Sequence, residues 1–271
     1  MNASYGRSTQ VHLCKHMLAI DTPTVVSGPT RRPTAVILWA SNGRPLKMRD
    51  TRSGAIWEGK AAVVAPHFLR AMQAEDCGLL SLNFEPGHPL FRGLCDITRE
   101  KGMLPLDGKS LLPCSNDVRN LVMSSDSVEM DRLATFIARL VLPSMEKAVP
   151  GDERVAVAIE RLEENLSKPP SLPELARSVG LSGRYLSDLF VDQVGLAARS
   201  YIVWRRYRRA LASLHLPHNL SDIAQSVGFY DQAQMARTFV EFFGFAPSRL
   251  REQGSIRFHG GPLHTSRALQ N

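Results

Sequence analysis

One ten-residue pattern occurs twice in this sequence: LPELARSVGL at residues 172–181 and LSDIAQSVGF at residues 220–229. The copies share a leucine, an alanine, a serine, a valine and a glycine, and equivalent residues such as Ala176 and Ala224 are 48 positions apart. A repeat with a period in this range indicates a duplicated supersecondary structure.

Each copy predicts a helix, a tight turn and a second helix. In the first copy, Ser171 and Glu174 form a capping-box pattern at the start of the helix, and Gly180 provides the positive φ that ends it. Ser182 is then placed to cap the second helix. The second copy repeats this order with Asn219 as the cap. Its turn glycine is Gly228, and its second helix is predicted to start near Asp231 and to bury Met235, Phe239, Phe242 and Phe243. This order is that of the helix-turn-helix, whose second helix enters the major groove of DNA.

The exposed residues near the start of each second helix are predicted to contact DNA. They are Ser182, Gly183, Arg184, Ser187 and Asp188 in the first copy, and Tyr230, Gln232, Gln234, Arg237 and Thr238 in the second. We expect Arg184 to read guanine, because its fork can bond O6 and N7 together. The glutamines suit adenine. The alternative for Arg237 is a bond to a neighbouring acid or to a phosphate.

The helix that is predicted to link the two units carries five arginines and no acidic residue. Phosphate contacts supply much of the affinity for nucleic acid, so this helix is predicted to add to binding, with Arg206 and Arg208 among its contacts. The five are Arg199, Arg205, Arg206, Arg208 and Arg209.

These residues resemble the DNA-binding domain of the AraC/XylS family of bacterial transcription regulators. The resemblance rests on ELARSVGLSGRYLSDLF, on Tyr201, Arg206 and Ala210 in the linking helix, and on DIAQSVGFYDQAQMARTFVEFFGFAPSRLR. It implies a helical domain over residues 149–253 with two helix-turn-helix units. It also implies that the partners are double-stranded DNA and RNA polymerase and that the protein activates transcription. Met235, Val240 and Glu241 depart from the residues that are common at these positions in the family.

Length and composition fit two domains. The chain has 271 residues, 44% of them hydrophobic, and a formal net charge of +7 that is spread over both halves. No apolar run is long enough to span a membrane and no signal peptide is recognised, so we expect a cytoplasmic protein without membrane contact. The four cysteines, Cys14, Cys77, Cys95 and Cys114, are too widely spaced to predict a zinc site.

The front of the chain predicts a small antiparallel β domain. Residues 1–33 are expected to be loose, with the alternative that Val11-His12-Leu13 opens a strand. Residues 34–148 contain strand-like runs at 35–40, 61–65 and 79–84. The family resemblance implies that such a domain is cupin-like and serves to bind an effector or to dimerise. The predicted fold class is therefore α+β, a cupin-like β domain with helices followed by an all-α double helix-turn-helix domain. A small-molecule pocket lined by Trp39, Trp57, His67 and Phe84 is predicted, and the alternative is that these side chains only fill a core.

Two helices are predicted after the strands, at residues 116–123 and 127–147. The apolar stripe between Val128 and Val141 either covers the sheet or forms the seam of a homodimer. The tail, residues 254–271, has no periodicity and is expected to be disordered.

The leading hypothesis for function is a sequence-specific transcription regulator whose front domain senses a small molecule or a partner. Two alternatives stay open: a cysteine-dependent DNA alkyl-transfer repair protein, and a regulator whose front domain binds only protein. The sequence has no H-x-H pattern in the front domain, so no metal, no other cofactor and no catalytic residue is predicted.

Overall fold

The computed structural model describes residues 8–107, 111, 127–142, 152–252 and 256–260. The chain forms two compact units. The first comprises residues 1–146 together with residues 239–261, and the second comprises residues 147–238 with residues 262–271. The predicted helix at residues 116–123 lies outside the described residues. Within the described residues, no helix is long and apolar enough to cross a membrane.

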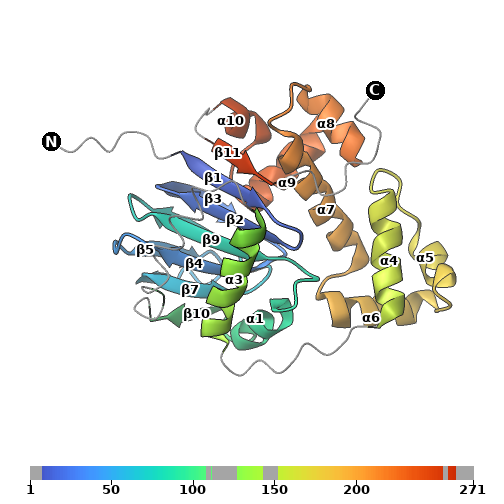
Figure 1. Ribbon diagram of the computed structural model, residues 1–271, viewed down its shortest axis with the longest axis horizontal. Helices are drawn as coiled ribbons and strands as arrows, with labels where there is room; N and C mark the ends of the chain where they lie inside the picture. Colours follow the sequence, from blue (N-terminus) through green and yellow to red (C-terminus); the bar gives the residue numbers. More distant parts are fainter. Residues whose placement is uncertain (1–7, 108–110, 112–126, 143–151, 253–255, 261–271) are drawn as a thin grey trace. The chain divides into compact units, whose positions relative to one another are not determined.

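The first unit is built on two β-sheets (Figure 1). The larger sheet has seven strands, which in spatial order are β10 (Met103–Leu106), β7 (Ala61–Val64), β4 (Ala35–Ala40), β9 (Leu79–Phe84), β2 (Met17–Thr22), β1 (Thr9–Leu13) and β11 (Ile256–His259). The smaller sheet has four, which are β3 (Val25–Thr30), β8 (Arg70–Ala74), β5 (Leu46–Asp50) and β6 (Ile56–Gly59). Every pairing is antiparallel except that of β1 with β11, which is parallel.

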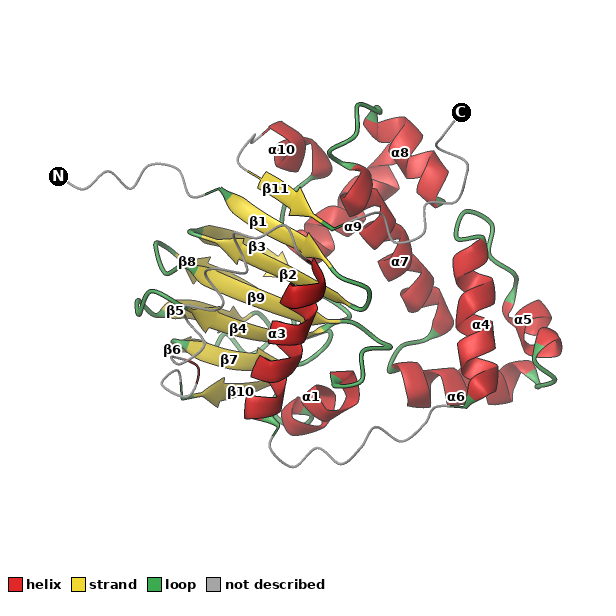
Figure 2. Cartoon of the chain, in the orientation of Figure 1, coloured by secondary structure: helices red, strands yellow, loops and turns green. Residues whose placement is uncertain are grey.

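Each face of the larger sheet has its own apolar core. Because side chains alternate across a strand, Val36 and Leu38 of β4 face the smaller sheet and pack with Met48 and Met72. Ile37 of β4 points to the opposite face. That opposite face is covered by α1 (Phe91–Thr98) and by α3 (Ser127–Val141), which lies across the strands in Figure 2. The buried residues of α3 are Met130, Leu133, Ala134, Ile137 and Ala138. The apolar stripe of this helix therefore covers the sheet.

The prediction that residues 1–33 are loose is wrong for residues 9–30, which form β1, β2 and β3. All six residues of β2 are buried. The sequence does not predict β2 because the residues on either side of it are polar and the turns that connect it are short. The predicted strands at 35–40 and 79–84 have the observed bounds, and the one at 61–65 ends at Val64.

The prediction of a disordered tail is also wrong for residues 256–259, which form β11. Thr9 pairs with Ile256 and His12 with His259. The rings of His12 and His259 stack with centroids 4.5 Å apart, and the His259 ring nitrogen Nε2 lies 2.6 Å from Gln10 Oε1. This short segment is a strand through its backbone pairing with β1, from the other end of the chain.

The helices of the second unit are α4 (Glu153–Glu164), α5 (Leu172–Ser178), α6 (Gly183–Val194), α7 (Ala198–Ser213), α8 (Leu220–Val227) and the first part of α9 (Gln232–Phe243). Apolar residues of α4, α5, α6 and α7 form one core, in which Leu162, Ala176, Phe190 and Tyr201 are buried. Helix α10 (Pro247–Glu252) follows α9 and belongs to the first unit.

Candidate nucleic-acid interface

Helices α5 and α6 form a helix-turn-helix with the predicted caps. Glu174 Oε2 accepts a hydrogen bond from the Ser171 backbone N–H at 2.8 Å, which completes the capping box. Gly180 has a φ of +69°, and the Leu181 N–H donates to the Ala176 carbonyl at 2.9 Å. Ser182 then accepts from the Tyr185 N–H at 3.2 Å and begins α6. The sharp turn is thus fixed by backbone geometry on both sides.

Helices α8 and α9 repeat this construction. Asn219 Oδ1 accepts from the Asp222 N–H at 2.8 Å, and Gly228 has a φ of +94°. The Phe229 N–H donates to the Ala224 carbonyl at 2.9 Å, which is the equivalent of the bond between Leu181 and Ala176. The repeat in the sequence is therefore a repeat in hydrogen bonding as well.

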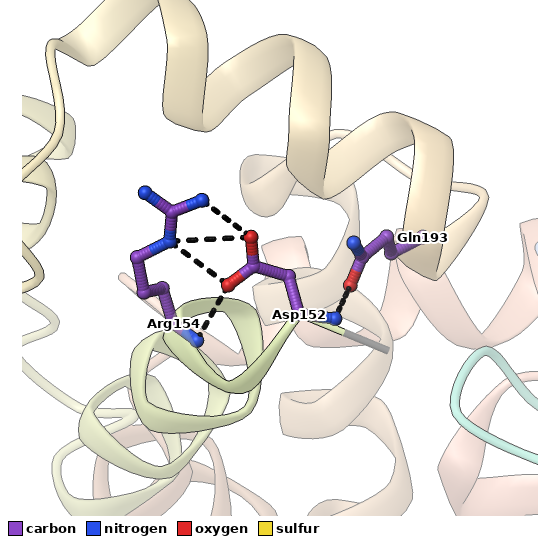
Figure 3. A network of polar contacts seen from close by, with 3 residues as sticks. All are labelled: Asp152, Arg154 and Gln193. Atoms are coloured by element: carbon purple, nitrogen blue, oxygen red, sulfur yellow. Dashed lines mark hydrogen bonds and ion pairs between the residues drawn. The ribbon is translucent and has the colours of Figure 1, made fainter. Parts of the chain in front are cut away.

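The first turn of α4 is fixed to α6 by a polar network (Figure 3). The Asp152 N–H donates to Gln193 Oε1 at 2.8 Å, and the Asp152 carboxylate accepts from Arg154 Nη2 at 2.6 Å. Hydrogen bonds from Arg154 lower the pKa of Asp152 to about 2. The Arg154 guanidinium also lies over the Tyr185 ring, 5.9 Å from its centroid. This network links the first turn of α4 to α6.

The exposed start of α6 carries the predicted first-copy residues. The Arg184 side chain is 92% exposed, and its Nε lies 3.8 Å from a carboxylate oxygen of Asp188, which is also exposed. Gly183 and Ser187 are half-buried, and Ser182 is exposed. Tyr185, which the sequence reasoning did not single out, is exposed beside Arg184. Its place three residues after the cap is a signal that could have identified it.

In α9 and the turn before it, the predicted second-copy residues separate into two groups. Tyr230, Gln232, Gln234 and Arg237 are exposed. Gln232 Oε1 accepts from Ser221 Oγ at 2.9 Å, and Gln234 Oε1 accepts from the Tyr230 N–H at 2.8 Å. Thr238 is buried, and its hydroxyl donates to the Gln234 carbonyl at 3.1 Å, so its prediction as a base-reading residue is wrong in this structure.

The arginines of α7 face the interior more than the solvent. Arg208 is fully buried, so the prediction that it contacts phosphate is wrong in this structure. Arg206 is half-buried and donates from Nε to the Leu166 carbonyl at 2.8 Å. The reason is helical periodicity: Arg205 and Arg208 fall on the buried stripe of α7 with Tyr201, Trp204 and Leu211. Arg199 is exposed.

The predicted pocket residues of the front domain do not form one cluster. Trp39 and Phe84 pack in the core beneath α1 and α3, whereas Trp57 packs at the core between the two sheets. His67 is exposed and has a φ of +59°, and desolvation of its ring lowers its pKa. Trp39 and Phe84 lie on one face of adjacent strands, and Trp57 belongs to the other sheet.

The front unit offers little for metal or thiol chemistry. Over the described ranges, no group of three or more His, Cys, Asp or Glu side chains could hold a metal ion. Burial raises the pKa of Cys77 to about 11 and that of Cys95 to about 12, which keeps both thiols protonated. Cys14 is buried. Cys114 lies outside the described residues.

This fold and this site define a DNA-binding protein with two helix-turn-helix units. A family model described as "Helix-turn-helix domain" matches residues 175–253. Residues 175–253 therefore carry a helix-turn-helix domain of the AraC type.

Two curated relatives illustrate the sequence similarity. The chain is 24% identical over 160 residues to the lactose operon transcription activator of Staphylococcus xylosus, which covers 52% of this chain and 57% of the relative. It is 31% identical over 81 residues to the Msm operon regulatory protein of Streptococcus mutans, which covers 30% of this chain and 29% of the relative. The chain thus matches little more than half of the first relative's length and under a third of the second's.

Solved structures show similarity over both units. An apo variant of ToxT from Vibrio cholerae aligns with a TM-score of 0.58 at 13% identity, over 87% of this chain and 97% of that chain. ToxT with a bound unsaturated fatty acid aligns with a TM-score of 0.50 at 12% identity, over 93% of this chain and 96% of that chain. At these identities the likeness shows the fold alone.

Proposed function

We propose that this transcription regulator reads a specific DNA sequence through the exposed starts of α6 and α9, with its front domain sensing a small molecule. One observation supports the DNA-reading part most: the two turns are equivalent. Each is closed by the same backbone bond and is followed by a helix whose start is capped by a side chain and carries exposed polar residues. The proposed DNA-contacting residues are Ser182, Gly183, Arg184, Tyr185, Ser187, Asp188, Arg206, Tyr230, Gln232, Gln234 and Arg237.

Arg184→Ala tests this part of the proposal. The long side chain of Arg184 is almost fully exposed at the start of α6, and Asp188 at 3.8 Å is only a surface partner. We expect the variant to lose about 1–3 kcal/mol of binding energy on its best site and to relax base preference at one position. Binding-site selection from random duplexes measures both. The matched control is Arg161→Ala, an exposed arginine on α4, which should return the wild-type motif. An unchanged motif for Arg184→Ala would show that this side chain does not read sequence.

Sensing of a small molecule is supported by the fold of the front unit. The chain aligns with ToxT bound to an unsaturated fatty acid and with ToxT bound to a naphthalenyl butenoic acid, and both of these ligands are carboxylic acids. A two-sheet sandwich with an apolar interior is suited to enclose such a molecule. Activation of transcription, contact with RNA polymerase and a cytoplasmic location complete the proposal, in keeping with a relative named as an activator.

We also propose that α3 forms a homodimer contact through its outer face. Its inner face is buried on the sheet, yet Val128, Phe136 and Leu140 are 58%, 52% and 43% exposed. These three residues are spaced by multiples of four, so they form one stripe along the helix. An exposed apolar stripe of this kind marks an interaction surface.

Phe136→Glu tests the dimer. A charge in a dry contact carries a large desolvation cost, so we expect the variant to sediment as a monomer at concentrations where the wild type sediments as a dimer. Because Phe136 is half exposed, stability should change by under about 1 kcal/mol. The control is Val157→Glu, at an exposed apolar residue of α4, which should leave the dimer intact. A wild type that is monomeric at all concentrations would contradict the proposal.

The function as a DNA alkyl-transfer enzyme receives no support from the described thiols. Cys14 and Cys77 are buried, and Cys95 is half-buried with a raised pKa, whereas a nucleophilic cysteine needs an accessible thiolate. We therefore propose that the protein is not an enzyme. A methylated-duplex transfer assay should yield no alkylated cysteine.

A further inference from the structure

A buried arginine lies inside the sandwich of the front unit. Strand β8 runs from Arg70 to Ala74, and its alternate residues Arg70, Met72 and Ala74 are buried. Met72 and Ala74 belong to the apolar core between the two sheets, so the period of two directs Arg70 toward the same interior. Arg70 is only 1% exposed.

Most of the Arg70 guanidinium has no partner within the part of the chain that the structure describes. Nη1 donates to the Phe68 carbonyl at 3.3 Å, but Nε and Nη2 are buried without a hydrogen-bond acceptor. Buried charges in proteins are ordinarily paired, because an unpaired ion loses its hydration without compensation. Burial lowers the pKa of Arg70 to about 9, and the positive charge of Arg32 contributes in the same direction. The side chain therefore remains a cation at neutral pH.

The two unpartnered groups form one edge of the guanidinium. Nε–H and Nη2–H point in parallel, and this edge matches the two oxygens of a carboxylate in a bidentate pair. Two other polar side chains lie in the segment that leads into β4. Arg32 Nη1 donates to Asn83 Oδ1 at 2.7 Å, and the buried Thr34 hydroxyl has no partner among the described residues.

The surroundings of Arg70 favour a ligand with an apolar part. Met72, two residues along on the same face, is the cross-strand neighbour of Met48, and both side chains lie in the core between the sheets. Methionine side chains are flexible and repack readily around an apolar guest. A carboxylate with a hydrocarbon body would pair with the cation and extend along these side chains.

We propose that Arg70 is the anion-binding residue of a ligand site inside the sandwich, and that it binds the carboxylate of a small amphipathic monocarboxylic acid through Nε and Nη2. The evidence for a ligand site is the buried guanidinium of Arg70. That this site binds the effector of the regulator rests, in addition, on the proposed sensing function.

The full-length protein tests the site with octanoate as the probe and 1-octanol as its neutral counterpart. We expect octanoate to raise the melting temperature and to bind in calorimetry, and octanol to do neither. Arg70→Met should weaken octanoate binding roughly tenfold or more, because the variant loses the free energy that a charge-assisted bidentate pair contributes to binding. Arg70→Lys keeps the charge without the fork and should bind with intermediate affinity. The control is Arg49→Met, an exposed arginine on the neighbouring strand β5, which should bind as the wild type does.

A second readout separates a ligand site from a structural role. If Arg70 is an uncompensated charge, Arg70→Met should melt at or above the wild-type temperature in the absence of octanoate. Wild-type protein that binds no octanoate, or Arg70→Met and Arg70→Lys variants that bind it as well as the wild type does, would overturn the proposal. A separate measurement of DNA binding tests the sensing role. If octanoate binds through Arg70 but does not change operator affinity, the ligand site is supported and its role as the effector site is refuted.

Discussion

Gly228→Ala is expected to destabilise the DNA-binding unit far more than Gly180→Ala, although both glycines end the first helix of a helix-turn-helix. Both have a positive φ, which by itself costs an L-residue about 1–3 kcal/mol. A Cβ on Gly180 would meet nothing within 4 Å, whereas one on Gly228 would lie 2.5 Å from Ser167 Cα and 2.6 Å from the Leu166 carbonyl oxygen. Backbone atoms cannot move aside cheaply, so Gly228→Ala should cost roughly 3 kcal/mol or more, and Gly180→Ala about 1 kcal/mol.

Urea unfolding followed by the helical circular dichroism signal measures this difference. The Gly180→Ala variant is the matched control, because it changes the same residue type at the equivalent turn. Equal costs for the two variants would show that the close approach of the segment after α4 to the second turn is incorrect.

Glu163→Ala is expected to have a comparably large effect. The Glu163 carboxylate forms a two-point ion pair with Arg205, with Nε to Oε1 at 2.8 Å and Nη2 to Oε2 at 2.9 Å. It also accepts a hydrogen bond from the Tyr201 hydroxyl. The Arg205 side chain is 6% exposed, so removing the Glu163 carboxylate takes an opposite charge away from a buried guanidinium. The expected loss is about 3–5 kcal/mol of unfolding free energy.

Chemical denaturation of two further variants makes this test specific. Glu164→Ala removes an adjacent exposed carboxylate and should change stability by less than about 0.5 kcal/mol. The double variant Glu163→Met with Arg205→Met replaces both charges by apolar groups and should recover much of the loss. A double variant less stable than Glu163→Ala would mean that the ion pair is not the source of the effect.

The helical unit could be predicted in detail because its signals are local. Capping residues Ser171, Ser182 and Asn219, and the turn glycines, act on backbone groups within a few positions of themselves. The order of the helices and the exposed side chain of Arg184 followed from the pattern alone. Arg208 was misplaced because composition, not periodicity, was used to assign it to the surface.

The front unit was less predictable because its structure depends on contacts between distant segments. Strand β11 pairs with β1 across almost the whole chain length, and no local pattern of Ile256–His259 requires that pairing. The pocket prediction grouped Trp39 and Phe84 with Trp57, although the two sheets and their two faces separate them. No sequence pattern distinguishes Arg70 from the other arginines. Its unusual feature is a buried guanidinium with two nitrogens that lack a hydrogen-bond partner, and only the structure shows this.

Selection of binding sites from a random duplex library with the full-length protein tests the central claim most directly. The account predicts a single enriched motif with two conserved blocks about one helical turn apart, because two recognition helices read successive major grooves. Footprinting on the selected site should protect one face of the duplex, and affinity should fall steeply as salt rises. Enrichment of no motif, or binding that does not distinguish the selected site from random DNA at moderate salt, would contradict it.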